Sequence, residues 1–97
     1  MRTVVVCRHD TTLEVLRKHG LVPDDAVVLR YIASPGQIQG AHVIGKLPPR
    51  LAVHADRVTT YELRIPQHLR GTELGVSEVN EYLTGLFTYR AERTEAA

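Results

Sequence analysis

The residues best suited to chemistry stand in the stretch from Cys7 to Thr12, Cys-Arg-His-Asp-Thr-Thr, which follows three valines. A histidine titrates near neutral pH and can transfer a proton, and an arginine offers a forked charge that suits a phosphate. If a strand precedes this stretch and a helix follows it, Arg8 and His9 also stand beside helix amides that favour anions. We therefore expect phosphodiester chemistry here. The alternative is that Arg8 pairs with Asp10 on the surface and His9 only ends the strand.

A second candidate stretch runs from Gly45 to Arg50, Gly-Lys-Leu-Pro-Pro-Arg. Its glycine lets a ligand approach the backbone, and Lys46 and Arg50 supply positive charge. The stretch lacks the pattern of a P-loop, and its alternative interpretation is a proline-started helix with solvated basic residues. A later polar loop, with Arg70 and Glu73, is able to reach a ligand or to remain solvated.

Two known catalytic loops do not fit the first stretch. A cysteine phosphatase loop needs an arginine six residues after its cysteine, but Leu13 stands there, so we interpret Cys7 as a buried strand residue. The string from Arg8 to Thr12 is similar to the phosphohistidine loop of the histidine phosphatases, although Asp10 replaces their glycine and the chain is much shorter. A phosphohistidine enzyme stays an alternative.

Neither a cofactor nor a metal is predicted. A Gly-x-Gly-x-x-Gly fingerprint is absent, so nicotinamide and flavin cofactors have no support. The five histidines are scattered, without a pair at four-residue helical spacing beside a carboxylate. A single cysteine excludes an internal disulfide and suits a reducing compartment.

Composition and charge limit the possible partners. Twelve Lys and Arg against eleven Asp and Glu leave a net charge of +1, which argues against long DNA or RNA and against a membrane surface. With 43% hydrophobic and 24% charged residues, the chain should fold. Apolar runs are too short for a membrane span and no signal sequence opens the chain, so we expect a cytoplasmic protein. We expect one domain over residues 1–90 and a disordered tail over 91–97, where apolar residues are few.

Hydrophobic patterning predicts strands over residues 2–7, 26–32, 41–47 and 58–65, and helices over 11–19, 49–56 and 76–89. The run of three valines is typical of a central strand, and the alternating pattern of 58–65 is typical of a strand near a sheet edge. Such alternation of strands and helices predicts a small Rossmann-like α/β domain, with a mainly parallel sheet flanked by helices. Ligands bind beyond the carboxyl ends of the strands in such folds, which selects the loops 7–12, 34–37, 45–50 and 66–73.

Four separated motifs occur in a recognisable order: Val-Val-Cys-Arg-His at 5–9, His-Val-Ile-Gly-Lys-Leu-Pro at 42–48, Tyr-Glu-Leu-Arg-Ile-Pro at 61–66 and Leu-Arg-Gly-Thr-Glu-Leu at 69–74. In this order the chain resembles the small CRISPR-associated Csx proteins of type III systems, in the group with a Val-Ile-Gly-x-Leu-Pro core. The similarity runs from about residue 3 to residue 83. It implies a CARF-like version of the α/β fold.

The resemblance implies a ring nuclease. Such enzymes bind a cyclic oligoadenylate second messenger, usually cyclic tetra-adenylate, and cleave it to linear products, which ends the antiviral signal. They act as homodimers without a metal, with the site in the dimer cleft. The alternatives are a non-catalytic sensor or sponge for the ring, and a structural adaptor.

Together, the residues and the resemblance select one candidate site. The catalytic candidates are Arg8, His9 and Lys46, with His9 transferring the proton while the two cations stabilise the phosphate. The candidates for substrate binding are Thr11, Ser34, Gly45, Leu47, Pro48, Arg50, Arg70 and Glu73.

Overall fold

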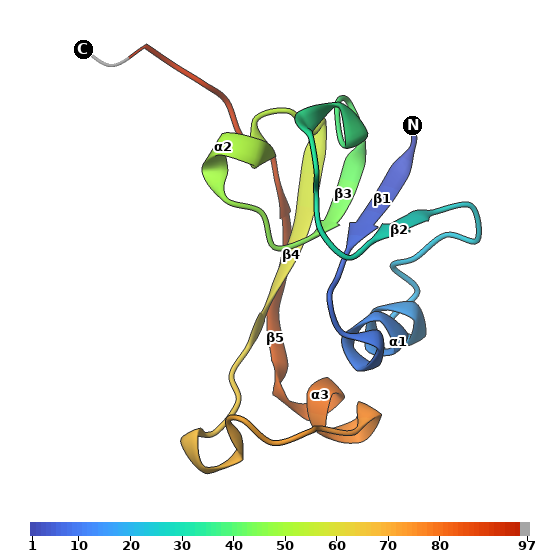
Figure 1. The fold of residues 1–97 in the computed structure, drawn as a ribbon, viewed down its shortest axis with the longest axis vertical. Helices are drawn as coiled ribbons and strands as arrows, with labels where there is room; N and C mark the ends of the chain where they lie inside the picture. Colours follow the sequence, from blue (N-terminus) through green and yellow to red (C-terminus); the bar gives the residue numbers. More distant parts are fainter. Residues whose placement is uncertain (96–97) are drawn as a thin grey trace.

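The computed structural model describes residues 1–95 as a five-stranded sheet with helices against it (Figure 1). The strands are β1 Thr3–Val6, β2 Val27–Leu29, β3 His42–Gly45, β4 Arg57–Leu63 and β5 Leu83–Tyr89. The helices are α1 Asp10–Lys18, α2 Pro49–Ala52 and α3 Val76–Tyr82, with short 3-10 turns η1 Pro35–Gln37 and η2 Gln67–Leu69. The strand order is β2-β1-β3-β4-β5, and only β5 is antiparallel to its neighbour. The predicted small Rossmann-like α/β fold is confirmed.

The strand β1 lies inside the sheet, between β2 and the middle strand β3, and it pairs with β3 in parallel from Thr3 with His42 to Val6 with Gly45. Successive side chains of a strand point to opposite faces, so a strand covered on both faces needs apolar residues throughout. Val4 and Val5 are each at most 1% exposed. The prediction that the valine run forms a central strand is confirmed.

Two hydrophobic clusters hold the two faces of the sheet. The first contains Val4, Ile38, Ala41, Val43, Ala52, Ala55 and Val58 and joins α2 to the sheet. The second contains Val5, Cys7, Leu16, Ile44 and Tyr61 and joins α1 to the opposite face. Because each helix is fixed by its own cluster, the segments that lead from strands into α1 and α2 have defined positions at one end of the sheet.

The helix predicted over residues 76–89 is wrong in its second half. The helix α3 begins where the Gly75 N–H donates to Oε1 of Glu78 at 3.2 Å, and it ends at Tyr82. Residues 83–89 instead form β5, which pairs with β4. Their leucines and Phe87 occur at helical spacing, but threonines and aromatic residues favour a strand, and the open edge of β4 supplies the partner. The strand β4, which the sequence predicts to lie near a sheet edge, is therefore the neighbour of the edge strand β5.

Side-chain hydrogen bonds tie the last three strands together. Nε2 of His42 on β3 lies 2.7 Å from Oγ1 of Thr59 on β4, which lies 2.8 Å from Oγ1 of Thr88 on β5. Thr59 is only 5% exposed, so its hydroxyl needs these partners. His42 is thus a structural residue, as its place in a strand predicts.

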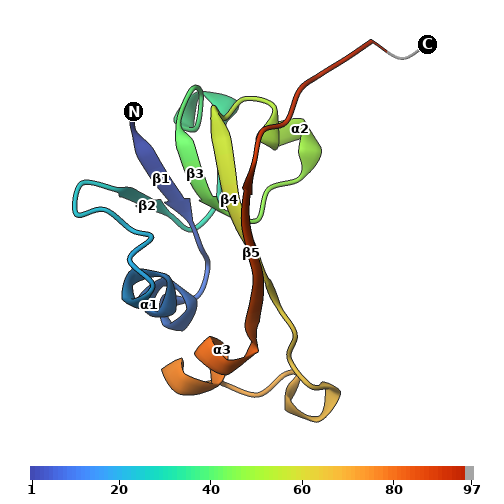
Figure 2. The same ribbon diagram turned by 180° about the vertical axis from the view of Figure 1, so that it is seen from behind.

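Residues 64–75, which we call the outer loop, lie beyond the long pair β4 and β5, at the end of the molecule far from α2 (Figures 1 and 2). The radius of gyration is 14.2 Å. A compact domain of this length has about 13 Å. The long strand pair, which carries the outer loop away from the centre of the sheet, is consistent with this excess.

Several predicted boundaries are too wide. The second strand stops at Leu29 instead of residue 32, and α2 stops at Ala52 instead of residue 56. Residues 90–95 form no helix or strand, while residues 96 and 97 of the predicted tail lie outside the described residues. Among residues 1–95, none of the helices has the length and apolar character that spanning a membrane requires.

Candidate functional site

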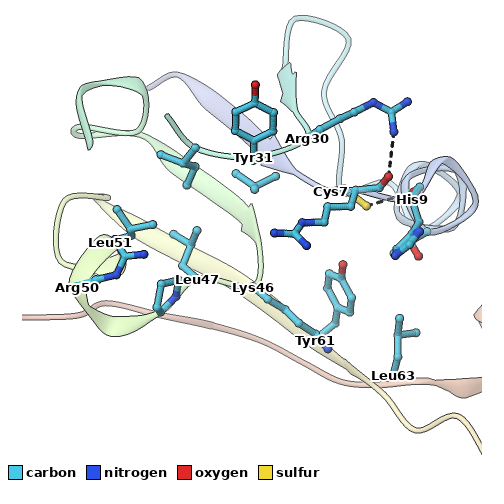
Figure 3. A pocket seen from close by; sticks show the side chains of 15 residues that line it. Cys7, His9, Arg30, Tyr31, Lys46, Leu47, Arg50, Leu51, Tyr61 and Leu63 are labelled. Atoms are coloured by element: carbon cyan, nitrogen blue, oxygen red, sulfur yellow. Dashed lines mark hydrogen bonds between the residues drawn. The ribbon is translucent and has the colours of Figure 1, made fainter. Parts of the chain in front are cut away.

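A pocket of about 590 Å³ opens at the carboxyl ends of β1, β2 and β3, where parallel α/β sheets bind their ligands (Figure 3). It is lined by Val6, Cys7, Arg8, His9, Thr12, Arg30, Tyr31, Ile32, Lys46, Leu47, Pro48, Arg50, Leu51, Tyr61 and Leu63. These residues come from four separate segments of the chain. The sheet therefore gathers them at one place.

The lining of the pocket is basic. It includes the cations Arg8, Arg30, Lys46 and Arg50, and also His9. Within the described residues no aspartate or glutamate lines it. Since the whole chain carries a net charge of only +1, the positive charge is concentrated locally and favours an anionic ligand.

The corner between β1 and α1 presents His9. The Cys7 N–H donates to the Leu29 carbonyl at 2.9 Å, and the Cys7 thiol donates to the His9 carbonyl at 3.3 Å. His9 is the N-cap residue of α1, and its carbonyl accepts the Leu13 N–H at 3.1 Å. The backbone is thus fixed, while neither ring nitrogen of His9 has a hydrogen-bond partner within residues 1–95. An exposed imidazole at a helix N-terminus is placed to exchange protons with a bound anion.

Arg30 holds the same corner from outside. Its Nη1 donates to the Arg8 carbonyl at 2.9 Å, and its Nη2 forms an ion pair with Oδ1 of Asp10 at 3.0 Å. The alternative in which Arg8 pairs with Asp10 is therefore wrong. The ion pair is largely exposed and contributes little to stability, but it leaves the Arg8 guanidinium without a carboxylate partner in the described part of the chain.

Gly45 stands where two strands of the sheet approach each other closely. Its φ is +148°, and a Cβ at this position would overlap the carbonyl oxygen of Val6 on the neighbouring strand. Only glycine allows β1 and β3 to approach here, directly before Lys46. The close approach of β1 accounts for this glycine without a ligand, and Gly45 is not among the residues that line the pocket.

Lys46 stands over Tyr61, which extends from β4 into the pocket. The Lys46 ammonium lies 5.4 Å from the centre of the Tyr61 ring, a cation–π distance. Tyr61 is 6% exposed. Burial, followed by the influence of the neighbouring Cys7 thiol, raises the pKa of Tyr61 to about 12. The phenol therefore stays neutral at physiological pH while its ring holds the ammonium at the pocket.

Six of the eleven predicted site residues line this pocket: Arg8, His9, Lys46, Leu47, Pro48 and Arg50. Thr11 does not line it and its neighbour Thr12 does. Ser34 precedes η1, where the Gln37 carbonyl accepts a hydrogen bond from Nη2 of Arg2, at 3.0 Å. Because Arg2 comes directly before β1, this loop lies at the amino ends of the strands and not beside the pocket. The structure thus differs from the prediction that residues 34–37 form a ligand-binding loop at the carboxyl ends.

Arg70 and Glu73 belong to the outer loop and are not part of the pocket lining. Arg70 N–H donates to the Gln67 carbonyl at 3.2 Å, a local contact, and both side chains are exposed. The structure brings neither residue to the other candidates within one chain.

Arg30, Tyr31 and Tyr61 are pocket residues that the sequence does not single out. The first two fall inside the predicted strand 26–32, but the real strand ends at Leu29 and the chain then turns across the pocket. The sequence signal for the end of β2 was Arg30, a charged residue directly after the apolar run 26–29. Among residues 1–95, no group of three or more histidine, cysteine, aspartate or glutamate side chains is arranged to hold a metal ion.

The fold and the pocket define a small Rossmann-like α/β protein with a basic pocket at its strand ends. The family model described as "Putative CRISPR-associated protein (Cas_VVA1548)" matches residues 4–92, and the chain belongs to this family. Neither the curated proteins nor the solved structures contain a match to the chain.

Proposed function

We propose that the protein is a metal-independent ring nuclease that binds and cleaves a cyclic oligoadenylate, with cyclic tetra-adenylate as the expected ring. One observation carries this proposal: Arg8, His9 and Lys46 line one basic pocket that lacks a carboxylate among its described lining residues. Membership of a CRISPR-associated family and the resemblance of four motifs to the type III Csx proteins support it. The substrate is expected in the cytoplasm.

The proposed reaction needs no outside nucleophile. A ribose 2′-oxygen attacks its adjacent phosphorus, the bond from phosphorus to the 5′-oxygen breaks, and the products are a 2′,3′-cyclic phosphate and a 5′-hydroxyl. The 2′-hydroxyl loses a proton and the leaving 5′-oxygen gains one, and His9 transfers protons in this step. Arg8 and Lys46 stabilise the additional negative charge on the phosphate, with Arg50 as an outer clamp.

The size of the pocket supports a shared site. Pockets of about 300–1,000 Å³ hold one drug-sized ligand. A volume of about 590 Å³ thus suits part of a four-nucleotide ring rather than the whole ring. We propose that a homodimer binds the ring across its two-fold axis. Arg70 and Glu73 take part only if the second copy brings its outer loop to the pocket.

The test is a cleavage assay in EDTA. Cyclic tetra-adenylate is incubated with excess protein, and the products are separated by chromatography. We expect linear products that end in a 2′,3′-cyclic phosphate. His9→Ala should lower the rate by about 10²-fold or more, whereas the control His68→Ala, in the outer loop, should retain it. A His9→Ala variant with the wild-type rate refutes the histidine assignment.

The alternative is a sensor or sponge that binds the ring without cleaving it. The unpartnered His9 ring favours this alternative, because catalytic bases are usually oriented by a further group. An intact ring together with measurable binding would support the sensor. Failure to bind any cyclic oligoadenylate would support an adaptor, and a phosphoryl group trapped on His9 would support a phosphohistidine enzyme.

A further inference from the structure

The wall of the pocket opposite His9 has a different character from the basic corner. Leu47 and Leu51 lie on one side in Figure 3, with Arg50 beside them and Tyr31 above them, while Cys7 and His9 lie on the other side. Leu47 and Leu51 pack against the first hydrophobic cluster, so this side has a firm apolar base. The pocket therefore combines an apolar wall, with Arg50 at its edge, and a basic corner.

Tyr31 is the unusual residue of the apolar wall. Its side chain is 68% exposed, although it lines a concave site and follows the partly buried Leu29 by only two residues. A large aromatic ring left open beside a cavity gains contact area when a flat ligand covers it. Among the described residues, Tyr31 makes no hydrogen bond through its hydroxyl that would fix it to the protein.

We propose that Tyr31, with Leu47 and Leu51, forms a subsite on which one adenine base of the ligand stacks. Bases stack on aromatic side chains, while cations bind the phosphate, and here both features occur in one pocket of about 590 Å³. This inference rests on the proposed function for the choice of adenine. It assigns recognition of the base to Tyr31 and the apolar wall, and phosphate chemistry to the basic corner.

The subsite predicts a preference that does not depend on cleavage. Adenosine monophosphate offers both a base and a phosphate, whereas ribose 5-phosphate offers only the phosphate. Full-length wild-type protein should therefore bind the nucleotide more tightly. Replacing Tyr31 by alanine should remove most of this difference, because a base stacked on an aromatic side chain contributes about 10-fold in affinity.

The experiment is an NMR titration of each ligand into the wild type, Tyr31→Ala, Tyr31→Phe and the control Phe87→Ala. Phe87 is 53% exposed on β5 and does not line the pocket. We expect Tyr31→Ala to weaken nucleotide binding about 10-fold with little effect on ribose 5-phosphate, and Tyr31→Phe and Phe87→Ala to bind as the wild type does. Because Tyr31 is exposed, its variants should fold, and their unchanged amide spectra outside the pocket would verify this.

The outcomes separate this proposal from the ring-nuclease proposal. Equal nucleotide affinities of wild type and Tyr31→Ala would overturn the subsite, even if the wild type cleaves cyclic tetra-adenylate. Equal affinities of the wild type for adenosine monophosphate and ribose 5-phosphate would overturn it as well. If nucleotide binding depends on Tyr31 but the protein leaves cyclic tetra-adenylate intact, the subsite proposal would stand and the ring-nuclease proposal would be refuted.

Discussion

The strand-end pocket and the outer loop both carry residues that the sequence motifs select, but their surroundings differ. In the pocket, Arg8 and Lys46 come from segments far apart in the chain, and the parallel pairing of β1 with β3 brings those segments together. In the outer loop, the hydrogen bonds of Arg70 and Thr72 reach back only three residues, to Gln67 and Leu69. A charged residue thus joins a site when strand register places it beside others, and a motif in a loop does not guarantee this.

The largest expected effect contrasts two glycines of positive φ, Gly45 in the sheet at +148° and Gly71 in the outer loop at +84°. Gly45→Ala should lower the free energy of unfolding by roughly 3 kcal/mol, because strain adds to the overlap with the Val6 carbonyl. Gly71→Ala should cost only about 1 kcal/mol, because nothing lies within 4 Å of the added methyl group. Urea denaturation followed by circular dichroism measures both. Equal losses would contradict the contrast.

The second comparison concerns two cations and rests on the proposed cleavage. Lys46→Ala should lower kcat/KM for cyclic tetra-adenylate by about 10²-fold, since it removes a charge that stabilises the phosphate. Arg70→Ala should change it by less than about 3-fold, because a solvent-exposed charge outside the pocket interacts weakly with the ligand. A loss in Arg70→Ala as large as in Lys46→Ala would show that the outer loop belongs to the working site, through a second copy.

The third comparison isolates the ring beneath Lys46. Tyr61→Leu should lower the cleavage rate by about 3-fold, because a cation–π contact of this kind contributes about 0.5–1 kcal/mol. Tyr61→Phe keeps the ring and should retain the rate, as should the control Tyr82→Leu on α3. If Tyr61 acts by positioning Lys46, Tyr61→Leu should have no further effect in the Lys46→Ala background. An equal effect in both backgrounds would indicate loss of packing instead.

The smallest expected effect concerns the pH dependence of stability, with His42 in the sheet and His68 in the outer loop. Burial, followed by the charge of Arg57, lowers the pKa of His42 below its ordinary 6.5, while Asp56 acts in the opposite direction. The unfolded chain therefore binds a proton at a higher pH than the folded chain does, and stability must fall as the pH decreases below 6.5.

His42→Gln should flatten this decrease in stability, whereas His68→Gln should leave it as it is in the wild type. Denaturant midpoints measured between pH 7.5 and about pH 5 test the difference, over the range in which histidines titrate. The same slope in wild type and His42→Gln would exclude His42 as its source.

The sequence predicts best where one physical constraint dominates. Three valines in a row must be covered on both faces, so the central strand and the pocket that follows it are predictable. Residues 83–89 satisfy helical spacing and strand propensity equally well, and only the unpaired edge of β4 decides between them. A contact so distant in the chain leaves no local signal.

The candidate site shows the same limit. Arg8, His9 and Lys46 directly follow strands that are easily predicted, so their meeting at one edge can be foreseen. Arg30 and Tyr31 were hidden because Tyr31 and Ile32 resume the apolar pattern after Arg30, so the predicted strand continues past Leu29, where β2 stops pairing with β1. The end of a strand depends on its partner, and the sequence does not show that partner directly.

The position of β5 also bears on how the protein folds. Its last residue, Tyr89, follows the end of β4 by 26 positions, so the edge of β4 stays open until this later segment has paired with it. An unpaired strand edge is a template for other chains. The polypeptide is therefore most exposed to wrong pairing while β5 is not yet in place, and a chain truncated between residues 63 and 83 would leave the sheet incomplete.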